Sequence, residues 1–241
     1  MQCDIRKYFA TLDQEILLNQ LERVIKCLPT LRLAAAIVQG SDFPRKSPDW
    51  YFPGDTLFTP MDRKKGLPLG NQTPQFFANV YLNKLDHFIV RQIRPAVYAR
   101  SVDDFLLFDS DRDKLAGALD AVHEYLASFR LLLHPGKSRI YRVCDGFPFL
   151  GWRIFPDHAR LQRANVIRFR RKMARLHDDW IEDKVDWKSI QCSVSAWIGH
   201  AMHGDTWRLR EQIFQRGFPM KPVKNFPAAA PPLWLPPTEE D

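Results

Sequence analysis

Residues 97–108 of this 241-residue chain read VYARSVDDFLLF, and this stretch decides the fold. Two short apolar runs, 97–102 and 105–108, flank the acidic pair Asp103 and Asp104. Short apolar runs divided by a polar dipeptide predict two antiparallel strands of a β-hairpin with the acids at its tip. Asp-Asp is not the favoured Asn-Gly or Asp-Gly turn sequence, so turn chemistry alone does not explain the acids.

The segments around the hairpin predict helices and further short strands. Helices are expected where apolar residues keep helical spacing, with Thr11, Thr73 and Ser110 as caps: 11–28, 31–38, 73–89 and 110–129. A strand is expected at 5–9, and hairpin-like segments around Pro135-Gly136 and Asp145-Gly146. This mixture predicts an α+β fold in which helices back an antiparallel sheet.

The acidic pair raises an electrostatic question. Carboxylates that share a buried hairpin tip repel each other, and burying them is costly unless a cation lies beside them. A divalent metal meets this need, because Mg²⁺ takes oxygen ligands and often uses one or two carboxylates together with substrate phosphates. Asp4, on another apolar stretch, is the candidate third ligand. From the pattern alone, Asp103 and Asp104 are either a metal site or an exposed hairpin turn.

Positive charge is concentrated in one part of the chain. The formal net charge is +7, and the stretch 151–177, where Asp157 is the single acid, carries the whole excess. Such a stretch is typical of a polyanion-binding protein, most often one that binds nucleic acid; a membrane surface and an acidic partner are the alternatives. The cysteines lie far apart and no apolar run approaches the length of a bilayer span, which predicts a reduced, cytoplasmic protein without a membrane partner.

Several stretches resemble the reverse transcriptases, above all bacterial enzymes of retrons, group II introns and diversity-generating retroelements. Three of them are CDIRKYF at 3–9, GLPLGNQTPQFFAN at 66–79 and YARSVDDF at 98–105. HPGKS at 134–138 is similar to the family's lysine motif, and FLG at 149–151 is similar to its primer-grip motif. Residues 195–208 resemble the start of a thumb, so the resemblance is collinear over about 1–216.

The resemblance implies a fold and an activity. The implied fold is an antiparallel-sheet polymerase palm backed by helices, followed by a helical thumb and a Pro-rich tail. The expected domains are a palm-like catalytic domain at 1–155, a basic thumb-like region at 156–217 and a disordered tail at 218–241. The implied reaction is two-metal transfer of a dNTP onto a primer 3′-hydroxyl, with an RNA template, a DNA primer and two Mg²⁺ ions, for which Mn²⁺ can substitute.

The resemblance also implies roles for individual residues. Asp4 and Asp103 would hold both metal ions, Asp104 would support them, and Ile5 would add its main-chain carbonyl. Lys137 would give a proton or positive charge to the departing pyrophosphate; without the resemblance, it is a solvated turn residue. The residues expected to border the nucleotide and template are Phe9, Leu69, Gly70, Gln75 and Asn79. Phe9 would exclude ribonucleotides; the alternative is that it is a core residue. Those expected to contact template and primer are Leu150, Gly151, Arg160, Arg163, Arg168, Arg170, Arg171 and Lys172.

Leu69 stands where many polymerases carry Gln, and this apolar residue is similar to that of error-prone retroelement enzymes. Two features depart from the family pattern. Ser101 stands where the family carries an aromatic residue. The chain begins three residues before Asp4, so we expect the fingers segment to be missing, or supplied by another chain or an accessory protein, and polymerisation by this chain alone to be weak or absent. Two rival functions stay open: a metal-dependent nuclease that uses the same acids, and a non-catalytic nucleic-acid-binding remnant of a palm and thumb.

Overall fold

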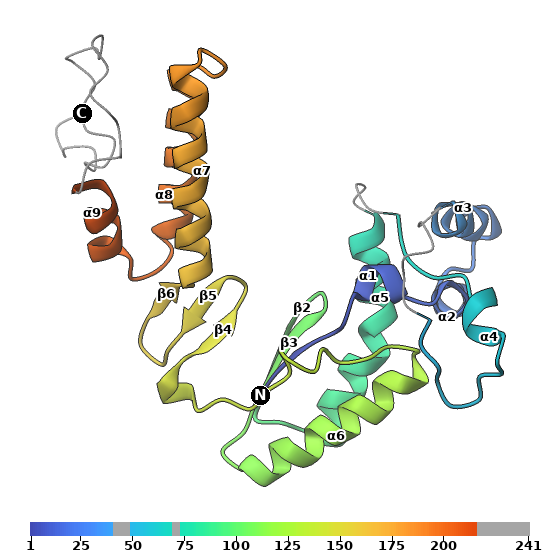
Figure 1. Cartoon of the computed structure of the whole chain (residues 1–241). Helices are drawn as coiled ribbons and strands as arrows, with labels where there is room; N and C mark the ends of the chain where they lie inside the picture. The colour runs from blue at the N-terminus through green and yellow to red at the C-terminus, as the bar shows by residue number, and fades with distance from the viewer. Residues whose placement is uncertain (41–48, 69–72, 216–241) are drawn as a thin grey trace. The chain divides into compact units, whose positions relative to one another are not determined.

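The computed structural model describes residues 1–40, 49–68 and 73–215, and the chain divides into two compact units, Met1–Tyr141 and Arg142–Asp241 (Figure 1). Helices and small antiparallel sheets occur in both units, which confirms the α+β class. The predicted Pro-rich tail, 218–241, lies outside the described residues. The expected limits of palm, thumb and tail stay predictions.

The first unit contains a three-stranded antiparallel sheet in the order β1-β3-β2. The strands are β1 (Gln2–Asp4), β2 (Val97–Ser101) and β3 (Asp104–Phe108). The predicted hairpin is confirmed, but its tip lies one residue earlier than expected, because Ser101 pairs with Asp104 and leaves Val102 and Asp103 as the turn. The helical elements are α1 (Tyr8–Thr11), α2 (Gln14–Val24), α3 (Leu28–Gln39), α4 (Thr59–Asp62), α5 (Thr73–Phe88), the π-helical turn η1 (Ile89–Ile93) and α6 (Arg112–Ser128).

Two predicted strand segments of the first unit are wrong. The strand expected at 5–9 is displaced to 2–4, because Lys7 takes a left-handed φ of 50° and turns the chain into α1. The hairpin expected around Pro135-Gly136 is absent from the described structure, because the residues on either side of it pair with the β1 segment through isolated bridges. The partners in these bridges are Gln2 with Arg139 and Ile5 with Leu133.

Two predicted helix caps are also wrong. Asp13, and not Thr11, caps α2 by accepting a hydrogen bond from the amide of Ile16 at 3.1 Å. Asp111, and not Ser110, caps α6 by accepting from two amides of the first turn. In both cases an aspartate immediately precedes the helix, and its carboxylate reaches the free amides there.

The core of the first unit fixes the sheet to α5 and α6, which cross beside the hairpin (Figure 1). The hydroxyl of Tyr8 donates to the carbonyl of Ala78 in α5 at 2.6 Å. Phe88 of α5 stacks on Tyr125 of α6, with ring centroids 4.0 Å apart. Phe105 and Leu107 of β3 are buried in the same core. Since burial of a large apolar side chain contributes about 1.5–3 kcal/mol, this core holds the hairpin against the helices.

The second unit has its own antiparallel sheet, in the order β4-β5-β6. Its elements are η2 (Val143–Asp145), β4 (Phe147–Phe149), β5 (Trp152–Ile154), β6 (Ala159–Leu161), α7 (Arg163–Ile181), α8 (Trp187–Ala201) and α9 (Trp207–Gln215). The hairpin expected at Asp145-Gly146 is wrong, because that dipeptide ends the 3₁₀ turn and the β4–β5 turn lies at Leu150 and Gly151. Both of these turn residues have positive φ, 47° and 85°, as a type I′ turn requires.

The helices of the second unit share a small apolar core. Phe169 of α7 stacks on Trp197 of α8, with centroids 4.0 Å apart, and Phe214 of α9 is buried against them. Within residues 1–40, 49–68 and 73–215, every helix is too short or too polar to cross a bilayer.

Gly204 is packed too tightly to accept a side chain. A Cβ built there would lie 2.3 Å from Cζ3 of Trp152 and 2.7 Å from the carbonyl oxygen of Ala159. Because the second neighbour is backbone, it cannot move aside without disturbing β6. The glycine therefore allows the chain after α8 to approach the sheet of the second unit.

Replacing Gly204 with alanine is expected to lower the free energy of unfolding of the second unit by about 1–3 kcal/mol, the usual cost of overpacking. Urea unfolding followed by tryptophan fluorescence measures this, because Trp50 is the only tryptophan within 1–141. Gly199→Ala is the matched control: it lies in α8 with open space around it, so helix propensity should stabilise the unit by up to about 1 kcal/mol. Equal stability of Gly204→Ala and the parent chain would contradict the packing argument.

Candidate active site

Pairing between β1 and β3 brings the three predicted acids to one end of the sheet. Asp4 lies directly opposite Asp104 in the antiparallel register, and the amide of Ile5 donates to the carbonyl oxygen of Asp103 at 3.2 Å. Like charges directly opposite each other destabilise a sheet. Burial raises the pKa of both Asp103 and Asp104, and the negative charge of Asp4 raises them further. The structure thus concentrates negative charge at this point.

Lys137 supplies the nearest positive charge. Its Nζ lies 3.0 Å from Oδ2 of Asp4, and its charge opposes the rise in the pKa of Asp103 and Asp104. The turn that carries it is bound to β1, because the amide of His134 donates to the carbonyl of Asp4 at 2.7 Å. The amide of Asp4 in turn donates to Oγ of Ser138 at 3.4 Å. The structure therefore brings the predicted lysine to the predicted acids.

Two further residues contact the site and were missed from the sequence. Gln2 is buried, and its Nε2 donates to Oδ1 of Asp104 at 3.1 Å. Its position two residues before Asp4 puts it on the same face of the strand, so the period of two could have indicated it. Arg100 donates to the carbonyl of Val102 in the hairpin turn at 2.9 Å. No local pattern indicates this contact, because it depends on the path of the turn.

The donor chemistry of these residues fits Mg²⁺. Carboxylate oxygens are its preferred ligands, and the ammonium group of Lys137 already lies against Asp4, which shows that this position favours a cation. In the parts of the chain that the structure describes, no three His, Cys, Asp or Glu side chains converge into a metal-binding group. The acids are therefore adjacent along the paired backbones, but their side chains are not gathered around a common point.

Three of the predicted nucleotide-binding residues lie on α1 and α5 of the first unit. Phe9 is half-buried on α1, and its carbonyl accepts from the amide of Leu67 at 2.9 Å, so it lies beside the 66–68 stretch. Leu69 and Gly70 lie outside the described residues. Gln75 and Asn79 are exposed one turn apart on α5, and Oδ1 of Asn79 accepts from Arg100 at 2.8 Å. Asn79 is thereby connected to the strand that carries the hairpin turn.

The predicted template-binding residues lie in the second unit. Leu150, which is 54% exposed, and Gly151 form the β4–β5 turn, and the carbonyl of Gly151 accepts from Asn165 at 2.9 Å. Arg160 is exposed on β6, with its guanidinium 5.5 Å from the centre of the Phe155 ring.

Helix α7 carries most of the predicted basic residues, and all of them are exposed. Four exposed residues recur three or four positions apart, opposite the buried side chains of Phe169 and Met173. These four, named the basic stripe, are Arg168, Arg171, Lys172 and Arg175. Arg163 and Arg170 are exposed on α7 outside the stripe.

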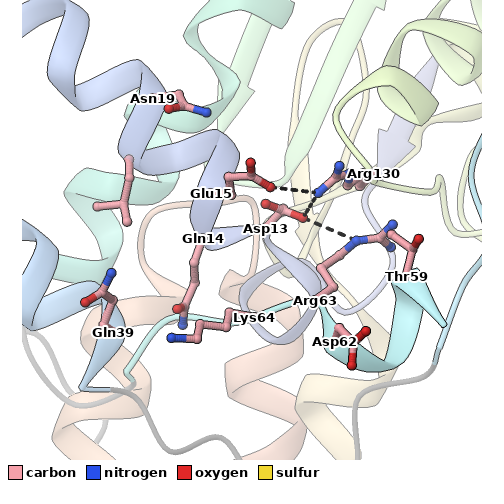
Figure 2. Close-up of a pocket in the computed structure, with 11 residues that line it drawn as sticks. Asp13, Gln14, Glu15, Asn19, Gln39, Thr59, Asp62, Arg63, Lys64 and Arg130 are labelled. Carbon is pink, nitrogen blue, oxygen red and sulfur yellow. Dashed lines mark hydrogen bonds and ion pairs between the residues drawn. The ribbon is translucent and has the colours of Figure 1, made fainter. Parts of the chain in front are cut away.

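A separate cavity of about 600 Å³ lies beside the start of α2 (Figure 2). Figure 2 shows Asp13 between Arg63 and Arg130, with ion-pair distances of 3.4 and 2.6 Å. Asp13 is completely buried, so these partners compensate its desolvation and join α2 to the segments after α4 and α6. None of the predicted site residues lines this cavity.

Comparison with known proteins gives one family. The family model described as "Reverse transcriptase (RNA-dependent DNA polymerase)" matches residues 1–154, which is more than half of the chain. No curated protein matches. The matched range includes the whole first unit and extends through β5.

Asp104→Asn is expected to stabilise the first unit at pH 7 by about 0.5–1 kcal/mol, a value that allows for solvent screening of a half-exposed group. Because the pKa of Asp104 is raised, the folded chain binds this proton more tightly than the unfolded chain. The stability that Asp104 contributes therefore falls as the pH rises through the window above its ordinary pKa of 3.8. Asparagine does not ionise, so it removes this loss of stability, and its side-chain oxygen can still accept the hydrogen bond from Gln2.

Urea unfolding followed by circular dichroism at pH 7 and pH 4 measures the effect. The difference between variant and parent should shrink at pH 4, because the raised pKa of Asp104 makes its protonated form more populated there than at pH 7. Asp120→Asn, at an exposed position of α6, should change stability at neither pH. A variant less stable than the parent at pH 7 would show that repulsion does not dominate.

Proposed function

Since the chain belongs to the reverse transcriptase family, we propose that it is an RNA-directed DNA polymerase that extends a primer 3′-hydroxyl with dNTPs on an RNA template. The observation that carries this proposal is the β1–β3 pairing, which sets Asp4 opposite Asp104 and ties Ile5 to Asp103. Family membership supports the reaction class, and the pairing supports the choice of residues. The spacing of the motifs favours a bacterial retroelement enzyme.

Asp4, Asp103 and Asp104 would hold two Mg²⁺ or Mn²⁺ ions, with the carbonyl oxygen of Ile5 as a further donor. When bound, the ions would neutralise charge on the phosphates and favour ionisation of the attacking hydroxyl. The raised pKa values of Asp103 and Asp104 support this assignment, because acids that resist ionisation together need a compensating cation.

In the proposed reaction, the primer 3′-hydroxyl loses its proton to solvent, and its oxygen forms a bond to the α-phosphorus as the bond from that phosphorus to the bridging oxygen of pyrophosphate breaks. Lys137 would donate a proton or its charge to the departing pyrophosphate, since its long side chain already reaches the acids. Phe9 would limit the space beside the sugar and so exclude ribonucleotides. Gln75 and Asn79 would border the nucleotide and template from α5.

The second unit would hold the template and primer. The basic stripe and Arg160 offer exposed cations for backbone phosphates, whose contacts are independent of sequence. Phe155 lies under the guanidinium groups of Arg153 and Arg160, which keeps these long side chains ordered at the β5–β6 hairpin.

Asp103→Ala is expected to reduce primer extension at least about 100-fold, because the loss of one group that stabilises transition-state charge typically lowers the rate by this factor. The assay uses the purified chain, a primed RNA template, dNTPs and Mg²⁺ or Mn²⁺, and Asp120→Ala is the control for an exposed acid elsewhere. Two results together would contradict the polymerase proposal: the parent chain extends no primer, and its salt-dependent binding of the template is unchanged by Mg²⁺ and by Asp4→Ala. The chain would then be a non-catalytic nucleic-acid-binding protein. Cleavage of the RNA with Mg²⁺ would instead indicate a nuclease.

Arg171→Ala is expected to weaken binding of the primed template and to lower the slope of log Kd against log salt concentration by about 1. Fluorescence anisotropy at several salt concentrations measures both quantities. Lys188→Ala removes an exposed charge from α8, outside the basic stripe, and should leave the slope unchanged. Equal slopes for Arg171→Ala and the parent would show that the stripe does not contact phosphates.

A further inference from the structure

Arg100 joins three parts of the first unit through one guanidinium group. Its Nε and Nη2 donate to the two carboxylate oxygens of Asp86 at 2.7 and 2.6 Å. Its Nη1 donates to Oδ1 of Asn79 at 2.8 Å and to the carbonyl oxygen of Val102 at 2.9 Å. Asp86 and Asn79 belong to α5, whereas Val102 is the first residue of the hairpin turn. The side chain thus connects the helix to the turn.

The turn needs such support. Val102 has a φ of 59°, which is unfavourable for a β-branched residue. Ser101, which precedes it, offers only a small side chain for packing. The carbonyl of Val102 belongs to the peptide group that joins it to Asp103, so the bond from Arg100 orients the backbone that carries this acid.

The other end of the connection is rigid. Asp86 binds Arg100 through both oxygens, an arrangement that fixes the plane of the guanidinium. The hydroxyl of Tyr98 also donates to Oδ1 of Asp86 at 2.6 Å. Neighbouring Leu82 and Leu85 are each 1% exposed in the core, so α5 provides a firm anchor for the turn.

Arg100 also determines which atom of the Asn79 side-chain amide is available to a ligand. Because the amide oxygen of Asn79 accepts from Arg100, the amide nitrogen is the group that this exposed side chain offers outward. An amide nitrogen is a donor only. Asn79 is therefore set to donate a hydrogen bond to an acceptor on a ligand beside α5.

We infer that Arg100 is a positioning residue that holds the Val102–Asp103 turn in place and presents the Asn79 amide nitrogen to an acceptor of the incoming dNTP. This inference rests on the proposed polymerase function. It adds a link between the turn that bears Asp103 and the helix that borders the nucleotide, so that one arginine sets the geometry of both.

The test uses three variants of the full chain. Arg100→Lys keeps the positive charge and can still pair with Asp86, but it loses the fork that reaches Asn79 and Val102 together. Asn79→Asp keeps the oxygen that accepts from Arg100 and removes the donor. Arg112→Lys, at an exposed position of α6, is the matched control.

Amide hydrogen exchange, resolved by residue, measures the support of the turn. Arg100→Lys should speed exchange at Val102, Asp103 and Asp104 about tenfold, while Arg112→Lys and Asn79→Asp leave these amides unchanged. Unchanged exchange in Arg100→Lys would overturn the inference. An equal acceleration at Leu106 and Leu107 would overturn it too, because this would indicate general loosening of the sheet.

Binding of dTTP to the chain with a primed RNA template, in Ca²⁺ to prevent turnover, measures the second part. Arg100→Lys and Asn79→Asp should each weaken dTTP binding about tenfold, and parental affinity in Asn79→Asp would overturn the role of the amide. If the parent chain neither binds dTTP nor extends a primer, the proposed function and the dTTP part fail together. In that case, amide hydrogen exchange at Val102, Asp103 and Asp104 in Arg100→Lys still decides whether the arginine holds the turn.

Discussion

Antiparallel pairing of β1 with β3 sets two carboxylates face to face, and the rest of the first unit is arranged around this unfavourable contact. Asp4 and Asp104 are register partners, and Asp103 immediately precedes Asp104 in the chain. Neither strand can slip to relieve the repulsion, because a shift of one residue would turn Cys3 and Phe105 out of the core, where both are completely buried. Apolar burial therefore maintains a charge arrangement that electrostatics alone would break.

Two polar networks support the first unit, one at the acids and one at the start of α2. Near the acids, Lys137 pairs with Asp4 and Gln2 donates to Asp104. Farther away, the buried carboxylate of Asp13 holds Arg63 and Arg130, which fixes the segments around α2. The second network keeps the scaffold rigid, and the first reduces the repulsion without removing it.

The sequence predicted the parts of this site that local pattern controls. Apolar runs on either side of Asp103 and Asp104 were enough for the hairpin, and the spacing of apolar residues was enough for the long helices. The partner of β1 was beyond local reasoning, because Gln2 and Leu106 are far apart in the chain. Asp4 was a candidate third ligand from its type and its apolar surroundings, but its register opposite Asp104 was not predicted. The strand at 5–9 failed because the left-handed Lys7 is not visible in an apolar pattern. Arg100 was missed because its partner Asp86 lies on a helix, and the sequence does not show which helix face meets the strand.

The position of Lys137 connects the resting site to the proposed reaction. Its ammonium group compensates Asp4 while no stronger cation is present, and its turn is held to β1 by the bond from His134 to the carbonyl of Asp4. A divalent cation at Asp4 would compete with this ion pair, whereas the backbone bond of the turn would remain. Lys137 would then stay within a side chain's length of the acids with its charge free for the pyrophosphate. One lysine can therefore stabilise the acids before metal binding and assist the leaving group afterwards, because the backbone rather than the ion pair fixes its place.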